Sequence, residues 1–264
     1  MIDKDSFKEV KEKVLISLWN FLDTYVDENY RLDRIWGKRS KIFDFYCSGK
    51  GVEIGASCYP IKINSNKVKI SYVDYIDRNV TTDIKTQRNL PYVHVDIIDE
   101  AEKLDKIAKN SLDFVVHCHV LEHCRNPIGV IRTHLSKIKR KGILFIAIPN
   151  KNYIFDKERP LTEWEHFVSD DEITRIENDR EHFREYLQLA IRYEGNTEEE
   201  IDRLIKDDYR PHFHVWNFET FYDFLLKTND RLNNAFVIEH YSENRLNRRT
   251  RGETREIIAV LRKR

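Results

Sequence analysis

VEIGASCYP, at Val52–Pro60, is a short apolar strand that ends in a glycine turn. Gly55 and the small residues after it let the backbone approach a ligand closely. The GxGxxG pattern of dinucleotide sites is absent, because Ala56 and Ser57 follow a single glycine. A pyrophosphate usually needs several glycines and a helix N-terminus. The turn therefore favours an uncharged sulfonium nucleoside, although an ordinary strand and turn would explain it equally well.

Working outward from this turn, short apolar runs alternate with helical stretches. The predicted parallel strands are Val52–Ile54, Val68–Val73, Tyr92–Val95, Leu112–His117 and Ile143–Ile148, and the predicted helices span 99–109 and 126–138. Such alternation predicts a parallel sheet covered on both faces. Two later runs, Phe236–His240 and Ile257–Leu261, are joined by a polar, hairpin-like link. The pattern predicts an α/β, Rossmann-like sheet of seven mostly parallel strands with an antiparallel terminal strand.

Three further features complete the predicted organisation, which is one domain over residues 1–264. Residues 6–26 have apolar residues at helical spacing, which predicts an amphipathic helix. A second short helix is expected near 30–37, and the predicted N-terminal helical extension spans 1–40. The crossover from Ala56 to Lys67 is about a dozen residues, near the minimum for parallel strands, so its helix should be short or replaced by a loop.

The segment 150–215 interrupts the alternation after the fifth strand. It is acidic, aromatic and rich in histidine, with helices expected at 170–193 and 197–206. An insert at this point reaches the carboxyl edge of the sheet, where open α/β sheets bind ligands. We interpret it as a lid or substrate-recognition insert; a purely structural appendage is the alternative.

Composition narrows the function classes. The 264 residues include 45 Lys and Arg against 45 Asp and Glu, so net charge gives no general reason to expect nucleic acid or an anionic membrane. No apolar stretch has membrane-helix length, and the N-terminus has no signal-peptide core. The four cysteines form no CxxC pair, which indicates reduced thiols and a cytoplasmic protein. A small-molecule partner is expected, and a homo-oligomer is compatible with these features.

An acidic residue ends the second predicted strand. Asp74 follows the glycine turn by about twenty residues, where a carboxylate can accept hydrogen bonds from both ribose hydroxyls. Asp77 is a nearby competitor, but it lies beyond the apolar strand. We therefore favour Asp74.

The stretch LDFVVHCHVLEH at Leu112–His123 is followed by an Asn-Pro pair, a helix and KGILFIAIP. Together with EIGAS, YVDY and VDIID in the same order, it resembles the methyltransferase type 11-like proteins, which are class I S-adenosylmethionine-dependent methyltransferases. The resemblance covers about residues 50–150. It implies S-adenosylmethionine as cofactor, with Asp96 against the adenine amino group and Ile97 on the adenine ring; a helix N-cap is the alternative for Asp96. The implied cofactor-binding residues are Glu53, Gly55, Ala56, Ser57, Asp74, Asp96, Ile97 and His117.

Two later segments extend the resemblance. Asp156–Thr162 (DKERPLT) and His212–Trp216 (HFHVW) are similar to a subgroup associated with sugar and surface-glycan biosynthesis. This implies O-methylation of a small sugar, sugar phosphate or glycan precursor. Methylation at nitrogen or carbon of another small molecule, or a non-catalytic binding protein, are the alternatives. The (N/D)PP(Y/F) tetrapeptide of DNA amino-methyltransferases is absent, which disfavours nucleobases.

Methyl transfer to oxygen often needs a base, and a neutral histidine is suited to that role. His119 follows the fourth strand, while His166 and His214 belong to the insert, so these three are the candidate bases. Each could instead be a structural histidine that orients a loop. Asp156 and Arg159 could bind acceptor hydroxyls or a phosphate.

A metal site is the alternative use of these histidines. The donors would be Glu122 with His119, His123, His212 and His214. The HxH spacing is short and common in strands, and the cysteines complete no zinc pattern. We therefore expect no metal from the sequence.

Overall fold

The computed structural model describes residues 38–77, 92–172, 176–248 and 252–264. Seven strands form one sheet in the order β3-β2-β1-β4-β5-β7-β6, and β7 is antiparallel to both of its neighbours while the pairs from β3 to β5 are parallel. The strands are β1 Gly49–Ile54, β2 Val68–Asp74, β3 Ile97–Ile98, β4 Leu112–Cys118, β5 Ile138–Pro149, β6 Phe236–Arg248 and β7 Gly252–Lys263. The predicted fold class is confirmed. The helices expected at 6–26 and 30–37 lie outside the described residues.

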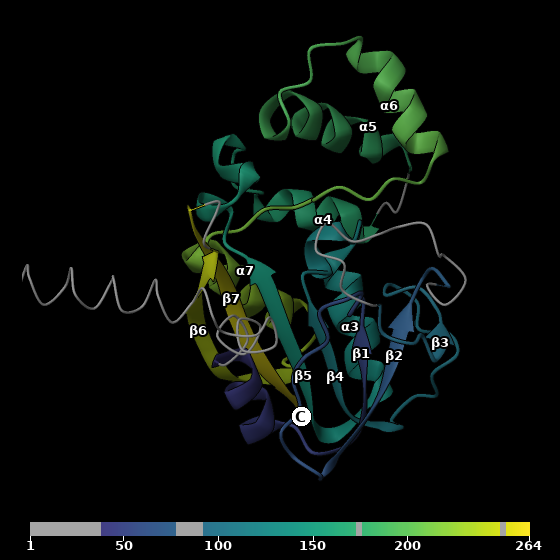
Figure 1. Cartoon of the computed structure of the whole chain (residues 1–264), viewed down its shortest axis with the longest axis vertical. Helices are drawn as coiled ribbons and strands as arrows, with labels where there is room; N and C mark the ends of the chain where they lie inside the picture. The colour runs from purple at the N-terminus through teal and green to yellow at the C-terminus, as the bar shows by residue number, and fades with distance from the viewer. Residues whose placement is uncertain (1–37, 78–91, 173–175, 249–251) are drawn as a thin grey trace, which may run out of the picture.

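Helices cover both faces of the sheet (Figure 1). Alternate residues of β4 point to opposite faces: Val115 belongs to the core shared with α3 (Pro127–Lys137) and α7 (Phe218–Arg231), whereas Phe114 packs edge-on against Phe43 of a helix over residues 38–46. This period of two is expected for a strand buried on both sides.

Local signals fix the two helices of the α3 and α7 layer. The side chain of Asn126 accepts the N–H of Gly129 at 2.6 Å, and proline follows at the first helical position. Asn217 and Thr220 form a reciprocal capping box at the start of α7. Asparagine caps satisfy backbone donors that a helix cannot pair internally. The helix predicted at 126–138 is thereby confirmed.

The third strand differs from its predicted place. Pairing with β2 occurs at Ile97–Ile98 and not at 92–95, because the chain before it is bonded elsewhere. The N–H of Val93 donates to the carbonyl of Ser57 at 2.8 Å. The segment thus packs against the glycine turn before it joins the sheet.

The helix expected at 99–109 is a series of turns. Leu104 and Asn110 have φ of 48° and 52°, which an α-helix does not allow. The carboxylate of Asp99 accepts the N–H groups of Glu100 (2.9 Å) and Lys106 (2.7 Å), so a side chain replaces helical backbone bonds. The crossover 56–67 has no helix, as predicted.

The terminal hairpin is longer than the apolar runs predicted. β6 and β7 stay paired from Phe236 with Lys263 as far as Arg248 with Gly252, through most of the polar link. Within the link, Glu243 accepts hydrogen bonds from Arg255 at 2.5 Å and from Asn150 at 2.7 Å. Paired polar side chains therefore carry the strands beyond their apolar part.

The insert lies beyond the carboxyl ends of β4 and β5 (Figure 1). Its helices are α4 Trp164–Glu172, α5 Ile176–Glu185 and α6 Thr197–Lys206, and a π-helical turn follows α5 at Tyr186–Ala190. Two short 3-10 turns, Lys151–Tyr153 and Phe155–Glu158, precede α4, and a third, Leu121–His123, follows β4 outside the insert. The helix predicted at 197–206 is confirmed, and the long one at 170–193 is divided. A small core of its own holds α5 and α6 together: Phe183, Tyr186, Leu187, Ile201, Leu204 and Phe213.

A buried ion pair joins the two ends of the described chain. Arg39 in the helix over 38–46 donates from Nε to Glu256 of β7 at 3.2 Å and from its Nη2 to the second oxygen, with exposures of 3% and 0%. Asn244 of β6 also donates to this carboxylate, at 2.7 Å. Burial alone would raise the pKa of Glu256, but Arg39 and His119 lower it to about 2.

We expect Glu256→Gln to destabilise the protein by about 3–5 kcal/mol, because it leaves the Arg39 guanidinium buried without its counter-charge. Chemical denaturation monitored by circular dichroism measures the change. Glu239→Gln is the matched control, since Glu239 of β6 pairs with Arg262 at 2.7 Å near the surface and its loss should cost about 1 kcal/mol or less. Equal losses in the two variants would contradict the prediction.

Candidate active site

The glycine turn leaves β1 at the carboxyl edge of the sheet. Gly55 has φ +66°, and a Cβ at this position would lie 2.7 Å from Cγ2 of Val120, so glycine is required there. Ala56 is buried, and Ser57 has a left-handed φ of 54°. The turn thus runs close under the end of β4 and forms a tight backbone edge.

Glu53, at the end of β1, holds the loop that follows this turn. Its carboxylate is 1% exposed, and both oxygens accept the N–H of Ile61 at 3.0 Å. Burial raises the pKa of Glu53 to about 7, against the opposing effects of the Ile61 N–H and Arg39. In this structure Glu53 therefore fixes the loop that follows Gly55, and its side chain is not exposed on the surface of the protein.

Asp74 ends β2 beside the turn. Its side chain is 4% exposed, and Oδ1 accepts the N–H of Ile76 at 3.3 Å. Gly55 donates its own N–H to the carbonyl of Val73 at 2.9 Å, so the turn and the end of β2 are held together. The carboxylate of Asp74 therefore lies beside the glycine turn at the carboxyl edge of the sheet.

Asp96 lies directly before β3. It is exposed, and its carboxylate accepts the N–H of Tyr72 at 2.8 Å instead of capping a helix. Ile97 is half-buried against the core, whereas Ile98 is 42% exposed. The structure thus leaves Ile98 as the more open apolar surface at this edge.

Tyr75 is a site residue that the sequence analysis missed. Its ring, next to Asp74, is 43% exposed, and the guanidinium of Arg210 lies 4.5 Å from the ring centroid. Arg210 comes from the end of the insert. The only sequence signal was an aromatic residue directly after the strand, but the contact shows that the insert reaches the edge of β2.

His119 follows β4 with φ 58° and lies between two carboxylates. Its Nε2 is 3.2 Å from Glu256, its Nδ1 is 3.5 Å from Glu122, and its side chain is 32% exposed. Burial alone would lower the pKa of His119, but the two carboxylates raise it. The contact with Glu256 is the shorter of the two.

His117 lies on the other side of the strand end. It is fully buried, and its ring packs edge-on against His134 of α3 at 5.1 Å between centroids. Burial holds the pKa of His117 well below its ordinary value. The structure thus places His117, which was predicted to bind the cofactor, in the core as a neutral side chain.

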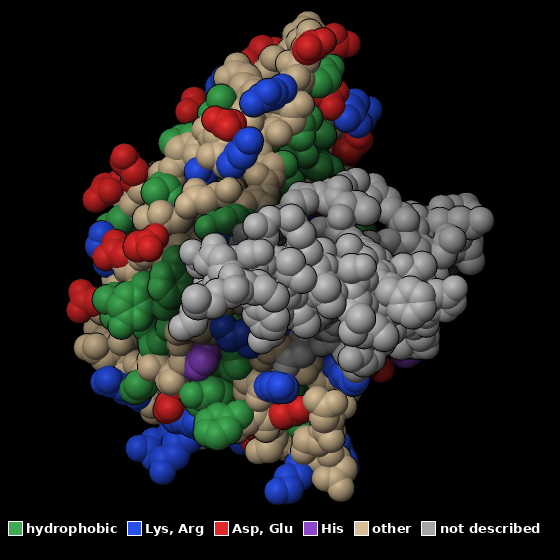
Figure 2. Space-filling model, turned by 60° about the vertical axis from the view of Figure 1, so that its left-hand side comes forward, with side chains coloured by type: hydrophobic (Ala, Val, Ile, Leu, Met, Phe, Trp, Pro, Cys, Tyr) green, Lys and Arg blue, Asp and Glu red, His purple; other side chains and the backbone are tan. Residues whose placement is uncertain are grey.

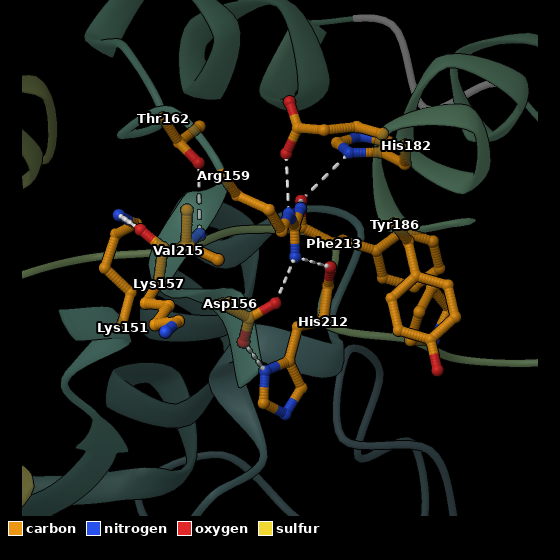
Figure 3. Close-up of polar contacts among 12 residues, drawn as sticks. Lys151, Asp156, Lys157, Arg159, Thr162, His182, Tyr186, His212, Phe213 and Val215 are labelled. Atoms are coloured by element: carbon orange, nitrogen blue, oxygen red, sulfur yellow. Dashed lines mark hydrogen bonds and ion pairs between the residues drawn. The ribbon is translucent and has the colours of Figure 1, made fainter. Parts of the chain in front are cut away.

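Asp156 and Arg159 are also buried, at 0% and 2% exposure (Figure 3). Arg159 donates to Asp156 at 2.9 Å, to Glu185 at 2.6 Å, and to the carbonyls of His212 and Phe213 at 2.7 and 3.2 Å. The polar groups of Asp156 and Arg159 bond to each other and to neighbouring parts of the insert, which they hold together. The sequence analysis expected them to face an acceptor, but in this structure both side chains are buried.

The two insert histidines meet each other and not His119. His214 is fully buried with Nε2 2.8 Å from Asp170, and His166, whose side chain is 39% exposed, lies 3.2 Å from the same carboxylate. His182, which the sequence analysis did not select, joins them at 3.2 Å from His166. Of the three candidate bases, only His119 lies at the carboxyl end of β4.

Comparisons with known proteins show the family of the chain. A family model described as a methyltransferase domain matches residues 40–190, more than half of the chain. The chain therefore belongs to this methyltransferase family. No curated protein matches it.

Solved structures share the fold. A putative S-adenosylmethionine-dependent methyltransferase from Listeria monocytogenes matches with TM-score 0.50 and 12% identity over 90% of this chain and 100% of that one. SAM-dependent methyltransferases from Aquifex aeolicus (TM-score 0.46, 13% identity, 91% and 97% covered) and Methanosarcina mazei (0.47, 13%, 84% and 96%) are similar. The family match supports S-adenosylmethionine as the cofactor.

Among the described residues, no helix is both long enough and apolar enough to cross a membrane.

We expect Arg159→Met to lower stability by about 3–5 kcal/mol, since Asp156 would lose its buried partner. Thermal or urea unfolding measures this loss. Arg180→Met is the control, because Arg180 pairs with Glu198 at 2.7 Å and with Asp202 at 2.6 Å on the surface and its removal should cost about 1 kcal/mol or less. A stable Arg159→Met protein with a raised acceptor KM would show instead that Arg159 binds the acceptor.

Proposed function

We propose that the chain transfers a methyl group from S-adenosylmethionine to a hydroxyl of a small sugar, sugar phosphate or glycan precursor. The observation that carries the proposal is the position of Gly55 and Asp74 at the carboxyl ends of the adjacent strands β1 and β2, in a chain that matches a methyltransferase-domain family. Asp96 lies directly before β3, with its carboxylate bonded to Tyr72 of β2. Bound there, the cofactor supplies a methyl group on a positively charged sulfur. The sugar class is supported by the resemblance of the DKERPLT and HFHVW segments alone.

His119 is the base in this proposal. Glu256 accepts Nε2–H, which leaves the lone pair on Nδ1 to take the proton of the acceptor hydroxyl. Glu256 then faces the imidazolium that forms and stabilises it, while Arg39 keeps the carboxylate in place. A carboxylate that fixes the tautomer of a histidine base is the arrangement used in hydrolytic triads.

The charge distribution on the surface of the insert supports an acceptor that is not a polyanion. Figure 2 shows acidic and basic side chains side by side over the upper part of the molecule. Glu198 there pairs with Arg180 at 2.7 Å and with Arg184 at 2.8 Å. Charges neutralised in pairs disfavour a nucleic-acid backbone as partner.

Asp74→Ala is expected to weaken binding of S-adenosylhomocysteine, because two ribose hydrogen bonds are lost. The loss should be roughly 1.5–3 kcal/mol, or about 10–150-fold in Kd. Isothermal titration calorimetry measures it, with NAD titrated in parallel. Asp105→Ala, at an exposed turn, is the control and should bind like wild type.

Asp74→Asn keeps the shape of the buried side chain and tests whether a weak Asp74→Ala variant is merely unfolded. Folded Asp74 variants with unchanged affinity would remove the ribose contact from the proposal. Failure of the wild-type protein to bind S-adenosylhomocysteine would refute the enzyme function as a whole.

His119→Gln should lower kcat at least about 10²-fold, with affinity for S-adenosylhomocysteine preserved. Because only neutral imidazole accepts a proton, the wild-type rate should fall as pH drops through the pKa of His119, which the two carboxylates place above 6.5. In Glu122→Gln one carboxylate is gone, so this acidic limb should move to lower pH. Rates are measured over a panel of sugars and sugar phosphates against non-sugar amines.

A flat pH profile with a mild His119→Gln effect would mean that no histidine acts as base, and catalysis would then rest on alignment of the reactants. Methylation of the amines alone would replace the oxygen acceptor by nitrogen. Binding of the cofactor without turnover on any acceptor would favour a non-catalytic role.

A further inference from the structure

Four potential metal ligands converge inside the insert. His166 and Asp170 stand one helical turn apart on α4, His182 comes from α5, and His214 lies on the extended segment that returns to the sheet. One ligand atom from each lies within 4.8 Å of all the others. Three of the four residues are buried and His166 is half-buried, so the cluster has one open side.

The distances within the cluster suit a tetrahedral ion. His166 Nε2 is 3.2 Å from His182 Nε2 and 3.2 Å from Asp170 Oδ2. The same Asp170 oxygen is 2.8 Å from His214 Nε2 and 3.9 Å from His182 Nε2. A zinc ion with bonds of about 2.0–2.2 Å keeps its ligand atoms roughly 3.3–3.6 Å apart. Small adjustments of these side chains would therefore complete the coordination.

A second contact orients one of the rings. His182 donates from Nδ1 to the carbonyl of Phe213 at 3.0 Å, which leaves the lone pair on Nε2 toward the cluster (Figure 3). Histidine ligands in proteins usually make such a contact with their other nitrogen.

We propose that His166, Asp170, His182 and His214 bind one zinc-type divalent ion that fastens the insert. Three imidazoles and one carboxylate are donors that zinc accepts, and four protein ligands leave no position open for a substrate, so the ion is structural and not catalytic. This revises the expectation of no metal drawn from the sequence. It does not rest on the proposed methyl transfer.

The position of the cluster explains what the ion would do. It joins α4, α5 and the segment around His214. The carbonyl of Phe213 accepts hydrogen bonds both from His182 and, at 3.2 Å, from Arg159. The separate core of the insert is small. Small cores commonly depend on a metal or a similar cross-link for stability.

The test begins with the full chain, purified without a histidine tag or chelator. Mass spectrometry of the metal content should find about one zinc per chain. Removal of zinc should lower Tm, and re-addition of zinc should restore it. Co²⁺ added to the metal-free protein should give the absorption spectrum of tetrahedral coordination.

Variants then assign the ion to this cluster. His182→Gln and His214→Gln should each weaken zinc binding at least about 10-fold, since even loss of a supporting contact commonly costs that much. His240→Gln is the control: this histidine is half-buried on β6, where its Nε2 lies 2.7 Å from Oγ of Ser242, and zinc content should stay at the wild-type value.

Two results would overturn the proposal. One is wild-type protein that contains no metal and gives no tetrahedral Co²⁺ spectrum; this readout does not require any variant to fold. The other is a wild-type zinc content in folded His182→Gln and His214→Gln. Binding of S-adenosylhomocysteine is recorded on the same samples, so failure of the metal proposal is separate from failure of the methyltransferase function.

Discussion

The carboxylate of Glu256 is the charge on which the carboxyl edge of the sheet depends. It is fully buried and receives Arg39 from the helix over 38–46, Asn244 from β6 and His119 from the end of β4. A buried carboxylate is costly unless such partners surround it. Once they do, three distant parts of the chain are fixed at one point, next to the place where methyl transfer is proposed. The same contacts serve stability and hold His119 in one orientation.

The insert repeats this principle with a positive charge. Arg159 is buried among Asp156, Glu185 and two backbone carbonyls, and it orders the segment that also carries His212 and His214 (Figure 3). Asp156 and Arg159, which the sequence analysis offered as acceptor ligands, thus support the insert in this structure. In the proposed function, the acceptor would contact side chains exposed around the strand ends, of which Tyr75 is one.

Periodicity predicted most of the fold because apolar strands and capped helices are local signals. The runs around β1, β2, β4 and β5 and the helix 197–206 lie where their side-chain patterns placed them. The third strand could not be placed, because its position depends on the bond from Val93 to Ser57, which joins residues far apart in sequence. The turns at 99–109 arise from Asp99 side-chain bonds that compete with a helix, and apolar spacing does not report such competition.

For the candidate site, the sequence predicted the positions of the strand ends. It predicted less well which side chains are exposed there. His117 and Val115 are two residues apart on β4, so they share a face, and that face is packed against α3. This alternation was visible in the sequence and would have assigned His117 to the core. His119 follows the end of the strand, where alternation stops and a left-handed φ turns the ring toward Glu256. Because that φ and the opposing carboxylate come from the folded chain, the environment of His119 required the structure.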